Sequence, residues 1–300
     1  MKPAIRIGVI GLSVHSDDYT NIINGTPGGN GRQGCLVTVL YHPPGNPDVE
    51  FKEEQLARFS ASVTKNGVRL VNSIAEMLPE VDAVMLLTND GRPHLKEIMP
   101  VLKAGKPVYV DKPMAESFAN VKAIFRQAEK YKVPIFTSSP LRYVRRAQQF
   151  AAGETVGKVT GAETYGPAPI QKSHTDLFWD GIHGVELLYT VMGTGCEYVS
   201  RTFSPAGDLV TGIWKDGRTG VFRGLRSGRI GFGGTVFGTE GIAEIGGFDG
   251  YQGLVDVILT FFKTGQPPVS AAETLEIYAF MAAADVSKKK EGSLVKISIA

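Results

Sequence analysis

Short apolar runs alternate with amphipathic segments along the first half of the chain. Runs rich in β-branched residues, each followed by a segment of helical periodicity, are typical of β-α units. The expected strands are residues 5–10, 36–41, 68–71, 81–87, 108–110 and 134–137, and the expected helices are residues 17–24, 53–59, 74–78, 93–103 and 117–132. Apolar strands that alternate with helices predict a doubly wound parallel sheet covered on both faces.

The pattern changes after about Gly157. Shorter runs of alternating apolar and polar residues follow, at residues 158–164, 196–203, 208–214, 219–226 and 229–237. Glycine turns separate several of them, and Lys215-Asp216-Gly217-Arg218 is typical of a hairpin connection. Helical segments at residues 182–192, 251–262 and 271–289 bracket these runs. The second half therefore predicts an α+β domain with a large, mostly antiparallel open sheet.

The length of 300 residues suits two domains better than one. We expect an N-terminal domain at residues 1–140 and a C-terminal domain at residues 141–300. Hydrophobic residues make up 43% of the chain and charged residues 21%, with a net charge of only +2. These values favour an ordinary globular protein and give no reason to expect nucleic acid as a partner. Without a signal peptide or an apolar run that spans a bilayer, we expect a cytoplasmic protein.

A glycine turn follows the first expected strand. The dinucleotide-binding fingerprint at this place is Gly-x-Gly-x-x-Gly, and residues 11–16 read Gly-Leu-Ser-Val-His-Ser. Because the turn opens a helix, its amide groups are expected to point at a phosphate. The candidate cofactor contacts here are Gly11, Ser13, Val14 and His15. A tight turn that binds no ligand is the alternative interpretation.

The second expected strand ends at residues 41–43, Tyr-His-Pro. An acidic residue normally stands here and binds the ribose hydroxyls of NAD. Its absence leaves the choice between NAD and NADP open, and Arg32 or His42 near the ribose would favour NADP. Thr88 and Asn89 follow the fourth strand at the same edge of the sheet, so they are further candidate cofactor contacts.

Lys112 stands where open α/β sheets bind their ligands. The apolar run of residues 108–110 ends at Asp111-Lys112-Pro113, just before the next expected helix. Loops at the carboxyl ends of parallel strands carry the ligand sites of such sheets. Lys112 is therefore a candidate catalytic residue and cofactor contact, and Asp111 and Pro113 are candidate cofactor contacts. A surface Lys-Pro turn is the alternative.

His183 lies in a short segment with two carboxylates at helical spacing. Asp180 precedes it by three residues and Glu186 follows it by three. A carboxylate beside a histidine fixes its tautomer and raises its basicity, which suits general acid–base catalysis. His183 and Asp180 are therefore candidate catalytic residues. In the alternative interpretation Asp180 caps the helix and His183 packs at the boundary between the domains.

These motifs together resemble the Gfo/Idh/MocA family of oxidoreductases. The resemblance rests on Gly11, Thr88-Asn89, the segment from Gly105-Lys106-Pro107 to Asp111-Lys112-Pro113, Leu141-Arg142-Tyr143, and Gly181-Ile182-His183 with Glu186. It implies a Rossmann domain, bound NAD or NADP, and hydride transfer to or from a carbon of a sugar, cyclitol or related polyol. It also implies that Lys112 bonds the reacting oxygen and that His183 exchanges the hydroxyl proton.

The chain departs from the family at Trp179, where the family commonly has an aspartate. A tryptophan there offers a stacking face to a sugar ring, and the expected substrate contacts are Arg142, Trp179 and Glu186. Two other functions stay open: a glycoside-cleaving or eliminating enzyme with transient oxidation by NAD, and a non-catalytic nucleotide or metabolite binder. We expect no metal and no membrane partner, and we expect a homo-oligomer formed through the C-terminal sheet.

Overall fold

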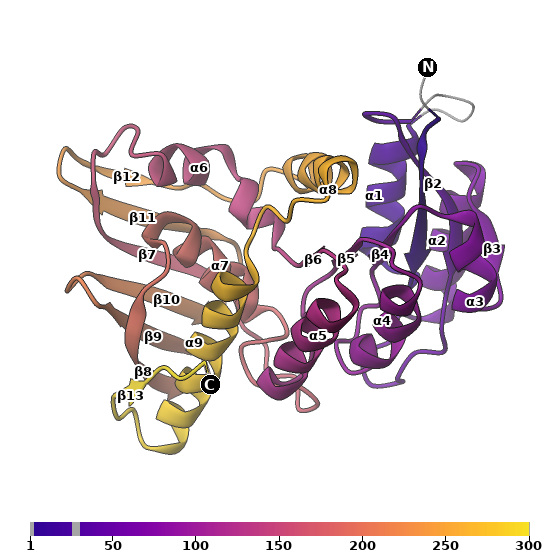
Figure 1. Ribbon diagram of the computed structural model, residues 1–300. Coiled ribbons are helices and arrows are strands. Elements are labelled where there is room, and N and C mark those ends of the chain that lie inside the picture. Colours follow the sequence, from indigo (N-terminus) through magenta and orange to yellow (C-terminus); the bar gives the residue numbers. More distant parts are fainter. Residues whose placement is uncertain (1–2, 26–30, 300) are drawn as a thin grey trace. The chain divides into compact units, whose positions relative to one another are not determined.

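The computed structural model describes residues 3–25 and 31–299, in which the chain divides into two compact units (Figure 1). The first unit takes in the chain up to residue 115, residues 119–137 and residues 251–270. The second unit takes in residues 116–118, 138–250 and the chain from residue 271 onward. The sequence is rich in glycine from Asn24 to Gly34, and residues 26–30 of this segment lie outside the described residues.

A sheet of six parallel strands forms the first unit, in the order β3-β2-β1-β4-β5-β6. The strands are β1 (Ile5–Ile10), β2 (Cys35–Tyr41), β3 (Arg69–Val71), β4 (Ala83–Leu86), β5 (Val108–Val110) and β6 (Ile135–Phe136). β1 pairs with both β2 and β4, so the strand order reverses direction beside it. The predicted parallel sheet is confirmed, and this order is the one that binds dinucleotides at the reversal point.

The helices of the first unit have apolar faces that match its sheet. They are α1 (Val14–Asn24), α2 (Glu53–Lys65), α3 (Ile74–Met77), α4 (His94–Lys103), α5 (Phe118–Tyr131) and α8 (Gln252–Thr264). In α4, for example, Ile98, Val101 and Leu102 are buried at helical spacing. We expected the segment of α8 in the C-terminal domain, whereas residues 251–270 belong to the first unit. In the structure its Phe261 packs edge-on against Phe136 of β6, with ring centroids 4.9 Å apart.

The second unit is built on a sheet of seven strands in the order β12-β11-β7-β10-β9-β8-β13. The strands are β7 (Val159–Pro167), β8 (Cys196–Ser204), β9 (Gly207–Trp214), β10 (Thr219–Leu225), β11 (Gly233–Gly238), β12 (Ile242–Glu244) and β13 (Val295–Lys296). All neighbours pair antiparallel except β7 and β10, which are parallel. The predicted mostly antiparallel sheet is therefore confirmed.

Two helices lie along one face of this sheet, α7 (Gly181–Met192) and α9 (Ala271–Lys289) (Figure 1). α7 is buried along its whole length. It packs closely on β10, because a side chain at Gly184 would bring its Cβ within 2.2 Å of the Phe222 ring. A shorter helix, α6 (Arg145–Ala151), contacts α7. Within residues 3–25 and 31–299, no helix has both the length and the apolar character to cross a membrane.

Candidate functional site

Gly11 brings the end of β1 directly against the end of β4. Its φ is +99°, and a Cβ there would lie 2.3 Å from the backbone nitrogen of Thr88. Its own N–H donates to the carbonyl of Tyr41, at 2.8 Å. Only glycine has both the conformation and the absence of a side chain that this contact requires. The structure thus brings together two predicted cofactor contacts, Gly11 and Thr88.

The two serines that replace the later glycines of the fingerprint bond each other. The Ser13 N–H donates to Oγ of Ser16 at 2.7 Å, and the Ser16 N–H donates to Oγ of Ser13 at 3.2 Å. This capping box begins α1 at Val14, earlier than the sequence pattern predicted. The N–H groups of Val14 and His15 have no acceptor within the helix, because the first turn of a helix leaves its N–H groups unpaired. These N–H groups and the positive end of the helix dipole can attract a phosphate.

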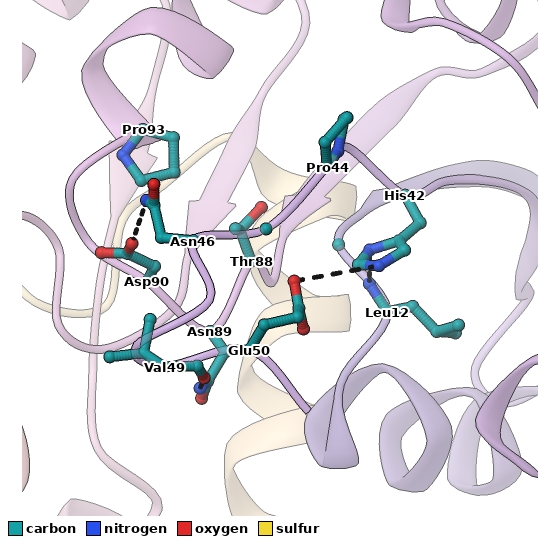
Figure 2. A pocket seen from close by; sticks show the side chains of 12 residues that line it. Leu12, His42, Pro44, Asn46, Val49, Glu50, Thr88, Asn89, Asp90 and Pro93 are labelled. Atoms are coloured by element: carbon teal, nitrogen blue, oxygen red, sulfur yellow. Dashed lines mark hydrogen bonds and ion pairs between the residues drawn. The ribbon is translucent and has the colours of Figure 1, made fainter. Parts of the chain in front are cut away.

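A cavity of about 150 Å³ lies at the carboxyl ends of β1, β2 and β4 (Figure 2). Its lining is Gly11, Leu12, His42, Pro44, Gly45, Asn46, Val49, Glu50, Thr88, Asn89, Asp90 and Pro93. Two bonds fasten its two loops together: Asn46 Nδ2 donates to Asp90 at 2.5 Å, and Asn89 Nδ2 donates to the Val49 carbonyl at 3.0 Å. Asn89, one of the predicted cofactor contacts, therefore forms part of the cavity wall.

His42 stands where the ribose-binding carboxylate was sought. Its Nδ1 accepts a hydrogen bond from the Leu12 N–H at 3.1 Å, and its Nε2 lies 4.0 Å from Glu50 (Figure 2). Burial lowers the pKa of His42, against the opposing charge of Glu50. Sequence reasoning missed Glu50, because it reaches the cavity from the loop after β2 and not from the strand end. Arg32, the other candidate for this place, is paired with Asp256 at 2.6 Å.

The Asp111-Lys112-Pro113 turn follows β5, as predicted, and its Lys112-Pro113 peptide bond is cis. Asp111 is buried and lies 2.5 Å from Nδ1 of His15, another predicted cofactor contact. Burial alone would raise the pKa of Asp111. The charge and hydrogen bond of His15, together with the charge of Lys112, outweigh burial and leave that pKa lowered. Lys112 is half-buried beside this negative charge.

His94, the first residue of α4, connects the Thr88 loop to the Lys112 turn. Its Nε2 lies 2.9 Å from the Thr88 carbonyl oxygen, and its Nδ1 lies 3.1 Å from that of Met114. One helical turn later, Glu97 accepts a bond from the Thr88 hydroxyl at 2.8 Å. Burial raises the pKa of Glu97. The first turn of α4 therefore holds the Thr88 loop and the Lys112 turn in place.

In the second unit, His183 is buried near the start of α7. Its Nδ1 lies 2.7 Å from Oγ of Ser139, and its ring meets the edge of Phe232 at a centroid distance of 5.6 Å. Asp180 precedes the helix, and its carbonyl accepts from the His183 N–H at 3.1 Å. Ser139 therefore occupies the Nδ1 side of the His183 ring. Ser139 carries no sequence motif of its own, and only the fold reveals its contact with His183.

Glu186 and Arg142, two predicted substrate contacts, bond each other. Glu186 accepts from Arg142 Nε at 2.7 Å, from the Ser138 hydroxyl at 2.6 Å and from the Ser139 N–H at 2.8 Å. A terminal nitrogen of Arg142 also lies 2.7 Å from Glu273, outside good hydrogen-bond geometry. Burial would lower the pKa of Arg142, but the two carboxylates outweigh it and raise that pKa. This buried pair fixes the turn that holds His183.

The third predicted substrate contact, Trp179, is half-buried on the loop before α7. Its ring meets His174 at a centroid distance of 4.9 Å and an angle of 61°. The same loop is anchored by Asp176, which pairs with Arg201 at 3.0 Å and with Lys288 at 2.6 Å. Trp179 thus lies on a loop that Asp176 anchors three residues earlier.

Residues 5–139 match the GFO_IDH_MocA family, described as an oxidoreductase family with an NAD-binding Rossmann fold. A curated relative, the myo-inositol 2-dehydrogenase of Thermotoga maritima, is 26% identical over 187 residues, which cover 54% of this chain and 56% of the relative. The chain thus spans about half the length of this relative. The expected family resemblance is confirmed for the first half of the chain.

Solved structures match over almost the whole chain. One is a putative myo-inositol dehydrogenase from Sinorhizobium meliloti, with a TM-score of 0.82 and 13% identity, covering 98% of this chain and 100% of that one. Another is scyllo-inositol dehydrogenase from Lactobacillus casei with NAD(H) and scyllo-inositol bound, with a TM-score of 0.75 and 14% identity, covering 98% and 99%. At these identities the likeness shows the fold of both units.

Proposed function

We propose that the chain is a dehydrogenase acting on CH–OH groups, because residues 5–139 match the Gfo/Idh/MocA family of oxidoreductases. The proposed reaction is hydride transfer between NAD or NADP and a hydroxyl-bearing carbon of a sugar, cyclitol or related polyol. The proposal rests first on Gly11, which lies against Thr88 beside a cavity at the reversal point of the parallel sheet. The inositol dehydrogenases among the relatives support the polyol class.

The first unit has the groups that a dinucleotide needs. The first-turn amides of α1 attract the pyrophosphate, and the cavity beside Gly11 has the polar lining that a nucleoside needs. When bound, the nicotinamide supplies the redox chemistry as hydride acceptor or donor. The chain's own residues then have to position the alcohol and handle its proton.

Lys112 and His183 are the proposed catalytic residues. A hydroxyl proton must leave as the hydride departs, and negative charge develops on the oxygen. The ammonium of Lys112 bonds that oxygen and stabilises the charge. His183 takes the proton at Nε2, while Ser139 at Nδ1 sets the orientation of the ring. Arg142 and Glu186 act through Ser139 as positioning residues, and Trp179 is proposed to stack on the polyol ring.

Steady-state kinetics of Lys112 variants test this assignment. With NAD and the best polyol of a panel of inositols and sugars, Lys112→Ala is expected to lower kcat about 10²- to 10³-fold. Its affinity for the dinucleotide should stay close to that of the unchanged protein. Lys103→Ala, at the exposed end of α4, is the matched control and should leave both quantities unchanged. Full turnover by Lys112→Ala would refute the role of Lys112.

We also infer that the open face of the second sheet joins two copies of the chain. Tyr165 of β7, Arg223 of β10 and Leu209 of β9 are direct neighbours across three strands. They point away from α7, because Thr164 beside Tyr165 bonds the Gly184 carbonyl in that helix. Tyr165 and Leu209 are exposed. Light scattering should give the mass of an oligomer, and Leu209→Glu should reduce it; a monomer at every concentration would contradict the inference.

A further inference from the structure

A carboxylate reaches the nucleotide cavity from the loop after β2. Glu50 lines the same cavity as Gly11 and Thr88. Its Oε1 accepts a hydrogen bond from the Phe51 N–H at 2.8 Å, which fixes one oxygen of the carboxylate. A Cβ on Gly45 would lie 1.4 Å from Oε2, so the loop closes tightly around the carboxylate. Glu50 is thus held at the side of the cavity that His42 also lines (Figure 2).

His42 is not a cation in this cavity at neutral pH. Its Nδ1 accepts from the Leu12 N–H, and a nitrogen that accepts carries no proton. The remaining ring proton is on Nε2, on the side of Glu50. Burial, which lowers the pKa of His42, favours the same neutral form. His42 therefore offers no positive charge to a phosphate group.

The cavity also lacks the arginine or lysine that a 2′-phosphate requires. Among the described residues, its lining includes two carboxylates and no lysine or arginine. Arg32 forms a two-point pair with Asp256 of α8, with Nε–Oδ1 2.6 Å and Nη2–Oδ2 3.0 Å. Arg92 pairs with Asp48 and Asp90. A phosphate on the ribose would meet the negative charge of Glu50, and the described lining residues include no lysine or arginine to offset it.

We propose that Glu50 binds the ribose diol of the adenosine half and makes the chain select NAD over NADP. This inference rests on the proposed function, since it places a nicotinamide dinucleotide in this cavity. A carboxylate accepts hydrogen bonds from both the 2′- and the 3′-hydroxyl, as the acidic residue at the end of β2 does in other Rossmann domains. Here a loop residue takes that role, and His42 takes the place at the strand end.

Calorimetry with NAD, NADP, AMP and 2′,5′-ADP at fixed ionic strength tests the proposal. The unchanged protein should bind NAD at least about tenfold more tightly than NADP, and AMP more tightly than 2′,5′-ADP. Glu50→Gln should weaken the binding of NAD about tenfold, so that the affinities for NAD and NADP become similar. Glu54→Gln, an exposed carboxylate in the first turn of α2, is the matched control and should keep the preference.

Two results would overturn the assignment of Glu50 while leaving the proposed function intact. One is equal or tighter binding of NADP by the unchanged protein, which needs no variant to fold. The other is a Glu50→Gln protein with a normal melting curve and an undiminished preference for NAD. If the unchanged protein binds neither dinucleotide, the proposed function itself fails, and the proposal fails with it.

Discussion

The imidazole of His15 is bonded to the carboxylate of Asp111, with Nδ1 2.5 Å from Oδ2. One residue belongs to the first turn of α1 and the other follows β5, so the bond connects the nucleotide turn to the turn that carries Lys112. The ring of His15 is also stacked on Tyr19, with centroids 5.3 Å apart. The contact fixes both side chains, and it has a consequence for stability at low pH.

The lowered pKa of Asp111 predicts that its contribution to stability is lost in acid. Because this folded-state pKa is below the unfolded one, the carboxylate stabilises the fold above about pH 4 and loses that effect as the pH falls through the folded value. Asp111→Asn should lower the free energy of unfolding at pH 7 by about 1 to 3 kcal/mol. Urea unfolding at pH 7 and at pH 3 should show the difference between the two proteins shrinking in acid. A constant difference would contradict this role.

Gly11→Ala should abolish dinucleotide binding. The added Cβ meets the Thr88 backbone at 2.3 Å, so β1 and β4 have to separate at the edge that forms the cavity. Gly25→Ala is the matched control, since Gly25 also has a positive φ, +57°, but a Cβ there has no neighbour within 4 Å. Fluorescence titration with NADH should show lost binding in the first variant and normal binding in the second. Normal binding by Gly11→Ala would disprove this account of the turn.

His94→Phe should destabilise the first unit strongly. It removes the ring N–H that donates to the carbonyl of Thr88 or of Met114, and an unpaired buried carbonyl costs about 1 to 3 kcal/mol. His94→Gln keeps a side-chain N–H donor and should lose less. Denaturant unfolding measures both values. Equal losses in the two variants would show that the ring's packing, and not its bonds, holds the two loops.

Arg142→Met should lower the stability of the protein more than the removal of both Arg142 and Glu186. The single change leaves a buried carboxylate without its cation, which costs about 3 to 5 kcal/mol. In Arg142→Met/Glu186→Met the buried carboxylate of Glu186 is removed as well, and Glu273, the other carboxylate beside Arg142, is partly exposed, so part of that stability should return. Thermal unfolding of the two proteins makes the comparison. A double variant less stable than the single one would show that the pair matters for its other bonds, those to Ser138 and Ser139.

The sequence predicted the elements well where local signals agree. β5 occurs at the predicted residues 108–110, because a buried apolar run is bounded by Gly105 and Pro113. The predicted start of α1 was late, since the capping box of Ser13 and Ser16 was not recognised as a helix start. The short strands β12 and β13 and the helix α6 were missed. Their few residues carry too little periodicity to be distinguished from loops.

The sequence predicted only those candidate residues that stand in a recognisable motif. Gly11, Lys112 and His183 each stand in a short pattern beside a predicted element. Glu50 and Ser139 have no pattern, because a loop brings Glu50 to the cavity of the first unit and Ser139 meets His183, 44 residues later, within the second unit. The end of β2 leads into His42 and no carboxylate, whereas the loop after β2 brings Glu50 to the cavity. Only the three-dimensional fold shows this position of Glu50.

Isotope transfer tests the central claim most directly. The protein is incubated with oxidised dinucleotide and a polyol that carries deuterium on its CH–OH carbons, and the dinucleotide is recovered for mass spectrometry. We predict deuterium in the reduced dinucleotide, in proportion to the ketone formed. Deuterium that passes to the dinucleotide and returns without net reduction would identify transient oxidation. Intact dinucleotide binding with no deuterium transferred from any polyol of the panel would contradict the proposed dehydrogenase.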